Sequence, residues 1–370
     1  MSTDPVAWPK PEYNSETVTQ TPVISAERLK PILKTVYGVE DCKVFQLTGY
    51  DDLNFRIEDV VFDERAHPNI KNDIVFIVKF TNPLESANPY LFDGQVKLAD
   101  LLRNNGIPTA LTLPTVDGKL WEVVSMTDEV TCPIRLFSFL PGVMLEKIGY
   151  SGAVYELIGE LLAKFHLITA DFHHPAYDGG FCHFMCMENW PALEEEFQLQ
   201  IDRGLLTDPK QIELCRRTFN DMNSDILSKR TEFEAGLTHS DVNETNVLLE
   251  RGPDGPPVIT GLIDFGDTHR SLLIFDIAAL VLYTVLDANE SDWRPIAESI
   301  LKGYATKKTP SNIDHLVVSM RGRIVSSLIY ALRTVRINYR NEDLSYILKT
   351  QTNGWKFLEV LTADYDAAKQ

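Results

Sequence analysis

Two short apolar runs, 247–249 and 258–263, constrain the fold more than any other part of this chain. The segment 251–257 between them is rich in Gly, Pro and Asp and cannot continue a strand. The pattern predicts an antiparallel hairpin, whose open ends lie side by side. Asn246 directly precedes the first run, Asp264 directly follows the second, and Asp241 lies shortly upstream. The sequence therefore predicts one edge of the fold where an amide oxygen and carboxylates gather.

These residues belong to two spaced motifs, H-x-D-x-x-x-x-N from His239 to Asn246 and D-F-G from Asp264 to Gly266. Mg²⁺ prefers oxygen ligands and often takes one or two carboxylates together with phosphates and water. Asn246 and Asp264 suit that role. Phosphoryl transfer also needs a group that accepts the hydroxyl proton, and Asp241 is the candidate catalytic base. His239 is expected to pack structurally. Each motif alone is common, but the occurrence of both motifs with a hairpin-sized spacer between them is much less likely by chance.

Composition narrows the possible partners. The chain has 370 residues, 44% of them hydrophobic, which is enough for two lobes with separate cores. Its formal net charge of −18 disfavours nucleic acid and anionic membranes, because both would be repelled. The longest apolar run, 272–286, contains Asp276 and is too short to span a bilayer, so it predicts a buried helix. Five scattered cysteines and the absence of an apolar leader predict a cytoplasmic protein.

A zinc site is the alternative for one histidine- and cysteine-containing stretch. Cys182, His183 and Cys186 lie near His173 and His174. The spacing C-x-x-x-C lacks a second half with matched ligands, so buried thiols among packed aromatic rings are the favoured interpretation.

The order of the predicted elements indicates an α+β fold. Residues 1–23 predict a flexible tail, and Ser25 a helix N-cap. Five strands are predicted at 44–47, 53–57, 74–80, 120–126 and 134–139. A helix at 91–104 interrupts them. We therefore expect a largely antiparallel N-terminal lobe at 24–139. A mainly helical C-terminal lobe at 140–370 would carry the hairpin.

The chain resembles the superfamily of aminoglycoside phosphotransferases and choline kinases. The resemblance covers about residues 25–365, and the two motifs carry it together with 49–55, 106–110, 140–142 and 158–166. It implies a bilobal, protein-kinase-like fold with a five-stranded N-lobe. It also implies transfer of a γ-phosphoryl group from GTP or ATP, with Mg²⁺, to a hydroxyl of 5-hydroxy-L-lysine. Alternative acceptors are choline, ethanolamine, homoserine or an aminoglycoside, and a different class is a nucleotide-binding pseudokinase scaffold.

The resemblance also assigns nucleotide-binding positions. Lys79 stands where the family keeps the lysine that holds the α- and β-phosphates. Gln95 stands where the family usually has a glutamate that pairs with this lysine. Either Gln95 tethers Lys79 more weakly by hydrogen bonding, or Asp93 replaces the glutamate after a rotation of the helix.

Further positions follow from the same resemblance. The turn 49–52 is expected to close over the nucleotide, with Asn54 or Asp52 contributing, although an ordinary β-turn is equally expected there. Backbone groups around Phe139 and Leu140 would meet the base, which could be adenine or guanine.

The nature of the acceptor can be inferred from what the catalytic region lacks. Ser240 replaces the arginine with which protein kinases read a phosphorylated activation loop, and the stretch between Asp264 and Asp276 is too short for such a loop. We therefore expect a small acceptor molecule in an enclosed acidic pocket rather than a peptide. Asp267 is expected to support Mg²⁺ or water.

Overall fold

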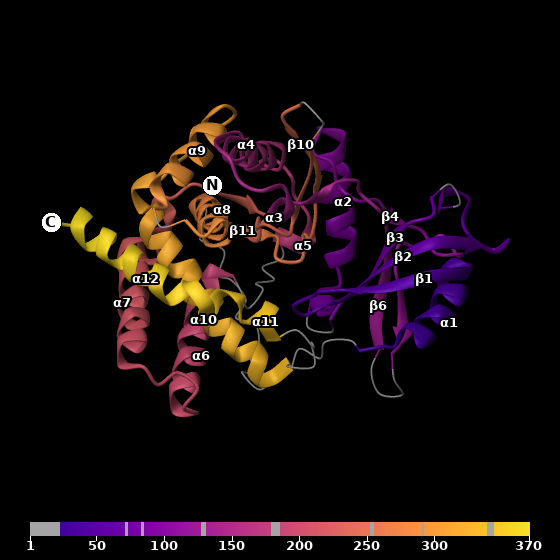
Figure 1. Cartoon of the computed structure of the whole chain (residues 1–370), viewed down its shortest axis with the longest axis horizontal. Coiled ribbons are helices and arrows are strands. Elements are labelled where there is room, and N and C mark those ends of the chain that lie inside the picture. The colour runs from indigo at the N-terminus through magenta and orange to yellow at the C-terminus, as the bar shows by residue number, and fades with distance from the viewer. Residues whose placement is uncertain are drawn as a thin grey trace, which may run out of the picture.

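The computed structural model describes residues 23–70, 73–82, 85–126, 131–178, 186–251, 255–290, 292–338 and 344–370. It shows a sheet-containing lobe joined to a larger helical lobe (Figure 1). The predicted tail, apart from residue 23, lies outside the described residues.

The sheet lobe begins with α1 (Ala26–Tyr37), and its first turn shows why it starts there. The Ser25 side chain accepts a hydrogen bond from the Arg28 N–H, and Gly38 ends the helix in a left-handed conformation. The strands that follow are β1 (Val39–Leu47), β2 (Leu53–Phe62), β3 (Phe76–Phe80), β4 (Thr112–Leu113), β5 (Glu122–Ser125) and β6 (Thr131–Ser138). Their order is β1-β2-β3-β6-β4, and β5 also pairs with β6. All these pairs are antiparallel.

All five predicted strands are present. The structure adds the two-residue strand β4, which the sequence analysis did not predict because two residues are too few to show an alternating pattern.

Helix α2 (Leu91–Asn104) has the predicted bounds and lies between the sheet and the helical lobe (Figure 1). Leu98 and Leu102 on this helix belong to the hydrophobic core of the helical lobe. A separate core beneath the sheet includes Phe55 and Phe76. Helix α2 therefore anchors the sheet lobe to its neighbour.

The helical lobe consists largely of α-helices. They are α3 (Leu145–Ile148), α4 (Gly152–Ile168), α5 (Pro175–Asp178), α6 (Trp190–Asp202), α7 (Pro209–Asp225), α8 (Leu273–Ala288), α9 (Arg294–Ala305), α10 (Leu316–Asn338), α11 (Leu344–Ile347) and α12 (Lys349–Ala368). Short 3₁₀ helices occur at Pro68–Ile70, Glu85–Ala87, Met187–Asn189, Leu227–Glu232 and Ile313–His315. Most side chains of α8 are buried, as predicted for this apolar run. No helix among the described residues is both long enough and apolar enough to cross a membrane.

The predicted hairpin is present. Strand β9 (Val247–Arg251) pairs antiparallel with β10 (Pro257–Leu262), and β7 (Val143–Met144) joins β9 on the other side. Strands β8 (Ala235–Thr238) and β11 (His269–Leu272) form a second antiparallel pair beside it. The loop from β8 to β9 and the loop from β10 to β11 are thereby brought to one edge.

Candidate active site

The loop between β8 and β9 holds Asp241 and Asn246 against each other. The Asn246 side-chain amide donates to the Asp241 carbonyl and to its Oδ2, both at 2.9 Å. The Asn243 amide donates to the same Oδ2 at 3.0 Å. The Ile263 N–H donates to the Asn246 carbonyl at 3.0 Å, which brings the D-F-G segment alongside. The predicted convergence of Asp241, Asn246 and Asp264 is present in the structure.

Asp276 on α8 supports this loop from below. Its carboxylate accepts hydrogen bonds from the backbone N–H of His239 at 2.8 Å and of Ser240 at 2.9 Å. His166 Nε2 lies 3.0 Å from the same carboxylate. Ser240 has a φ of 69°, an unusual conformation that these contacts hold in place. In the sequence, the signal for this role of Asp276 is that it is an isolated carboxylate within an apolar run.

His239 is buried and packs structurally in this loop. Its Nε2 donates to the Ile263 carbonyl at 3.1 Å, and its Nδ1 accepts from the Asp241 N–H at 3.3 Å. Its ring also contacts the Phe265 ring in a tilted arrangement, with a centroid distance of 5.3 Å.

Asp241 has the electrostatics of a base that works near neutral pH. Burial and the negative charge of Asp267 raise the pKa of its carboxyl to about 7, although the Arg323 guanidinium, 3.5 Å away, acts in the opposite direction. The Asp241 side chain is still 28% exposed, so a substrate can reach it. Arg323 lies far downstream on α10, and no motif pointed to it.

Lys79 on β3 faces two carboxylates. Its ammonium lies 2.9 Å from Asp52 Oδ2 and 3.0 Å from Asp264 Oδ1. Burial alone would lower the pKa of Lys79, but the charges of Asp264 and Asp52 raise it above its ordinary value. Asp52 is held in turn by the Asn82 backbone N–H at 2.8 Å and the Asn82 side chain at 2.9 Å.

The predicted pairing of Lys79 with Gln95 or Asp93 is wrong. Gln95 accepts a hydrogen bond from Arg135 at 2.5 Å and donates to the Phe265 carbonyl at 3.1 Å. Asp93 pairs with Lys97 and His174 instead. The reason is the buried Arg135 guanidinium. Arg135 on β6 is the register partner of Lys79 on the neighbouring strand β3, and it donates to the side-chain oxygen of Gln95. Gln95 therefore ties α2 to the D-F-G segment.

The other predicted nucleotide-binding residues lie on β2 and directly after β6. Asn54 on β2 is paired with Lys79 in the strand register. Phe139 directly follows β6, its ring lies under the Arg56 guanidinium at 4.8 Å, and it is 39% exposed. Leu140 packs beside Gly261 on β10, close enough that a Cβ at Gly261 would lie 2.8 Å from the Leu140 Cδ1 atom.

The oxygen atoms of Asn246 and Asp264 fit a magnesium ion. Because the Asn246 amide nitrogen is occupied by Asp241, its Oδ1 is the atom left to face a cation. Asp264 is 45% exposed, and Lys79 outweighs burial and lowers the pKa of its carboxyl, which stays ionised. Among the described residues, no three His, Cys, Asp or Glu side chains form a ready-made metal site. A cation held by two protein oxygens and by phosphates matches the usual chemistry of Mg²⁺.

The residues of the alternative zinc site are separated or not described. Cys182 and His183 lie outside the described residues. His174 contacts Asp93 at 2.9 Å, and His173 contacts Asp178 at 3.2 Å.

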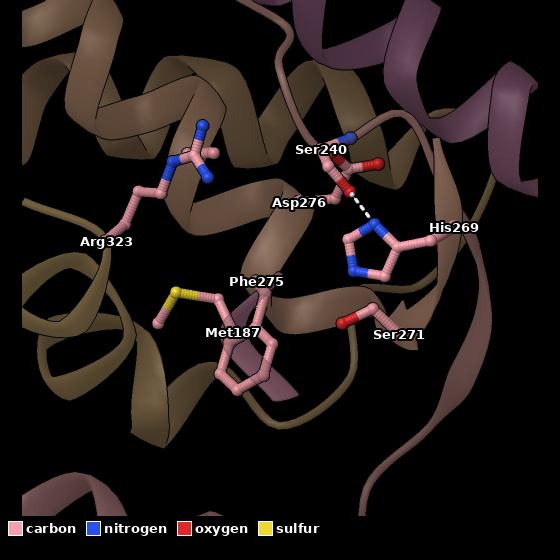
Figure 2. Close-up of a pocket in the computed structure, with 8 residues that line it drawn as sticks. Met187, Ser240, His269, Ser271, Phe275, Asp276 and Arg323 are labelled. Carbon is pink, nitrogen blue, oxygen red and sulfur yellow. Dashed lines mark hydrogen bonds between the residues drawn. The ribbon is translucent and has the colours of Figure 1, made fainter. Parts of the chain in front are cut away.

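A pocket adjoins the catalytic loop (Figure 2). Its lining residues are Met187, Ser240, His269, Ser271, Phe275, Asp276, Ala279 and Arg323. The Ser240 hydroxyl and His269 Nδ1 are 3.1 Å apart within it. Arg323 belongs both to this pocket and to the ion pair with Asp241, so the pocket lies next to the candidate base.

Known proteins resemble this chain in sequence and in fold. Residues 50–311 match the family model described as the phosphotransferase enzyme family. Hydroxylysine kinase of Mus musculus is 22% identical over 353 residues, which cover 92% of this chain and 90% of that protein. Among solved structures, a microcompartment-associated aminopropanol kinase matches with a TM-score of 0.68 at 16% identity, over 92% of this chain and 98% of that one.

A second solved structure, of an amicoumacin kinase with AMP-PNP, Ca²⁺ and its substrate, matches with a TM-score of 0.63 at 16% identity, over 88% of this chain and 92% of that one. The predicted kinase-like α+β fold is thereby confirmed. The chain belongs to the phosphotransferase enzyme family, and it is a phosphotransferase that acts on a hydroxyl group.

Proposed function

We propose that this chain is a hydroxylysine kinase, which transfers the γ-phosphoryl group of GTP or ATP to the hydroxyl of 5-hydroxy-L-lysine. The observation that carries the proposal is the convergence of Asp241, Asn246 and Asp264 beside Lys79. The similarity to hydroxylysine kinase over nearly the whole chain supports the choice of acceptor.

Each side chain has a defined task in the proposed reaction. The acceptor hydroxyl oxygen attacks the γ-phosphorus, the bond to the β-phosphate oxygen breaks, and the nucleoside diphosphate leaves. Asp241 takes the hydroxyl proton, for which a pKa near 7 is well matched. Lys79 binds the phosphates as a compact cation. Mg²⁺, when held by Asn246 and Asp264, supplies further neutralisation of phosphate charge.

The two lobes divide the work under this proposal. The lobe at 24–139 binds the nucleotide, and the lobe at 140–370 binds the acceptor and performs the chemistry. Asn54 lies beside Lys79, and the backbone around Phe139 and Leu140 meets the base. The net charge of −18 favours an acceptor that carries amino groups and disfavours nucleic acid and anionic membranes as partners. The five scattered cysteines favour a cytoplasmic location.

A coupled assay of nucleoside diphosphate release tests the acceptor and the donor together. We expect release with hydroxylysine and none with lysine, which lacks the hydroxyl. GTP and ATP are compared, and choline, ethanolamine, homoserine and an aminoglycoside serve as alternative acceptors. Faster turnover of any of these would replace hydroxylysine as the proposed substrate.

The catalytic variant Asp241→Asn separates an enzyme from a pseudokinase scaffold. Turnover should fall roughly 10²- to 10⁴-fold, the usual contribution of a positioned base, while nucleotide affinity stays unchanged. A magnesium series on the parent protein should show product formation that depends on the metal. No product at any concentration would favour the scaffold.

A further inference from the structure

Arg323 is a buried cation with one long ion pair. The residue is 6% exposed, and its Nε donates to the Tyr283 hydroxyl at 3.0 Å. The carboxylate that pairs with it is Asp241, at 3.5 Å, the limit for an ion-pair hydrogen bond. The Asp241 contact is made by its Nη2 atom.

Two other arginines of α10 have closer carboxylate partners. Arg321 lies 2.7 Å from Asp221, and Arg336 lies 2.9 Å from Glu196. A buried charge is costly unless it is paired and hydrogen-bonded. The ion pair of Arg323 with Asp241 is longer than these two, so a carboxylate placed closer would be a better partner for its guanidinium.

The side chains that line the pocket beside Arg323 combine apolar and polar groups. Figure 2 shows the guanidinium on one side of the pocket, with Met187 and Phe275 forming an apolar wall. Polar groups from Ser240, His269 and Ser271 lie opposite.

We propose that Arg323 binds the carboxylate of the acceptor and so makes the enzyme select an amino acid over an amino alcohol. This inference rests on the proposed function. The planar guanidinium matches a carboxylate in geometry and charge, which a single ammonium cannot do. Because Arg323 also contacts Asp241, a hydroxyl at the base and a carboxylate at the guanidinium must be joined by a short chain, as in hydroxylysine. Choline and ethanolamine carry no carboxylate and would leave Arg323 with only its long contact to Asp241.

A substrate comparison tests the inference directly. kcat/KM is measured for hydroxylysine and for its decarboxylated analogue, in the parent protein and in Arg323→Met and Arg323→Lys. We expect Arg323→Met to reduce the preference for hydroxylysine over the analogue by about 10- to 100-fold, mainly through KM, as for a lost charge-assisted contact. The substrate preference of Arg323→Lys should lie between those of the parent protein and Arg323→Met. Because Arg323 also affects Asp241, kcat falls for both substrates, and their ratio removes that shared effect. An unchanged ratio would overturn the inference.

A binding experiment separates this inference from the proposed function. Calorimetry compares lysine with its decarboxylated diamine, neither of which carries the reacting hydroxyl. We expect Arg323→Met to lose the preference for lysine. That result supports the carboxylate site even if the parent protein does not phosphorylate hydroxylysine. Absence of phosphorylation would count against the proposed function alone. Equal affinities for lysine in parent and variant overturn the inference.

Two further variants provide the controls. Arg217→Met removes an arginine paired with Asp366 on the surface of α7, outside the pocket, and should leave both preferences unchanged. Tyr283→Phe removes the hydroxyl that orients the Arg323 guanidinium and should shift the preferences in the same direction by a smaller factor. If the Arg323 variants do not fold, the Tyr283→Phe result decides, and unaltered preferences there would refute the inference.

Discussion

Asp276 is a buried carboxylate in an apolar helix, and its partners explain why it is there. Two backbone N–H groups of the catalytic loop donate to it, from His239 and Ser240, and His166 lies beside it. Burial alone would raise the pKa of Asp276, but the hydrogen bond and charge of His166 lower it below its ordinary value. The carboxylate thus stays ionised and fixes the backbone from which Asp241 extends.

Asp241 itself should reduce stability above neutral pH. Its pKa is raised from 3.8 to about 7 in the folded protein, so the folded state binds this proton more tightly than the unfolded state. Between these values, stability falls as pH rises, and the cost is complete above about pH 7. Asp241→Asn removes that cost. The melting temperature of the variant relative to the parent should therefore be higher at about pH 8 than at about pH 5, measured without ligands.

The reverse result would contradict the electrostatic assignment. A variant whose relative melting temperature falls or stays constant between the two pH values would mean that Arg323 outweighs burial and Asp267 in the folded protein. Asp366→Asn, at a surface pair with Arg217, serves as the matched control and should show no such rise with pH.

The turn between β1 and β2 determines how Lys79 is held. Gly49 lies against the end of this turn, and a Cβ added there would sit 2.4 Å from the Asp52 carbonyl oxygen. Gly49→Ala must therefore shift the turn. We expect this shift to lengthen the ion pair between Asp52 and Lys79, which is 2.9 Å in the structure. We expect the KM for the nucleotide to rise several-fold, with a smaller change in the KM for the acceptor. Steady-state kinetics with each substrate varied in turn measure this.

Gly152→Ala is the matched control for that substitution. Gly152 begins α4, and a Cβ there meets nothing within 4 Å. Its kinetics should equal those of the parent. If Gly49→Ala also behaves like the parent, the turn has no part in holding Lys79.

Local sequence patterns allowed some of these elements to be predicted. The features that could not be predicted depend on contacts between residues far apart in the chain. The hairpin β9–β10 and helix α2 follow from short stretches of apolar periodicity and turn residues, so Asn246 and Asp264 could be placed together. The Asp52–Lys79 pair depends on the orientation of a turn against β3. Arg323 reaches Asp241 only through the packing of α10, far along the chain. No sequence spacing encodes either contact.

The sheet lobe and the helical lobe are connected through the D-F-G segment. Lys79 from the sheet lobe reaches Asp264, and Gln95 on α2 reaches the Phe265 carbonyl. Gln95 is in turn held by Arg135, whose guanidinium lies over the Phe92 ring at 4.4 Å. The D-F-G segment is therefore the point at which nucleotide binding in one lobe can be coupled to the other.

Asp264→Ala should remove the contribution of Mg²⁺ to nucleotide binding. In the parent protein, nucleotide with Mg²⁺ should raise the melting temperature by more than nucleotide alone, because ligands that bind only the folded state stabilise it by about 2.7 kcal/mol at 100 times their Kd. In Asp264→Ala the part of the increase that depends on Mg²⁺ should disappear, since Asn246 alone is a weak ligand. Thermal unfolding over a magnesium titration measures both quantities, with Asp366→Ala as the control that keeps the full response. The same Mg²⁺-dependent increase in Asp264→Ala as in the parent would exclude Asp264 as a metal ligand and leave its pairing with Lys79 as its role.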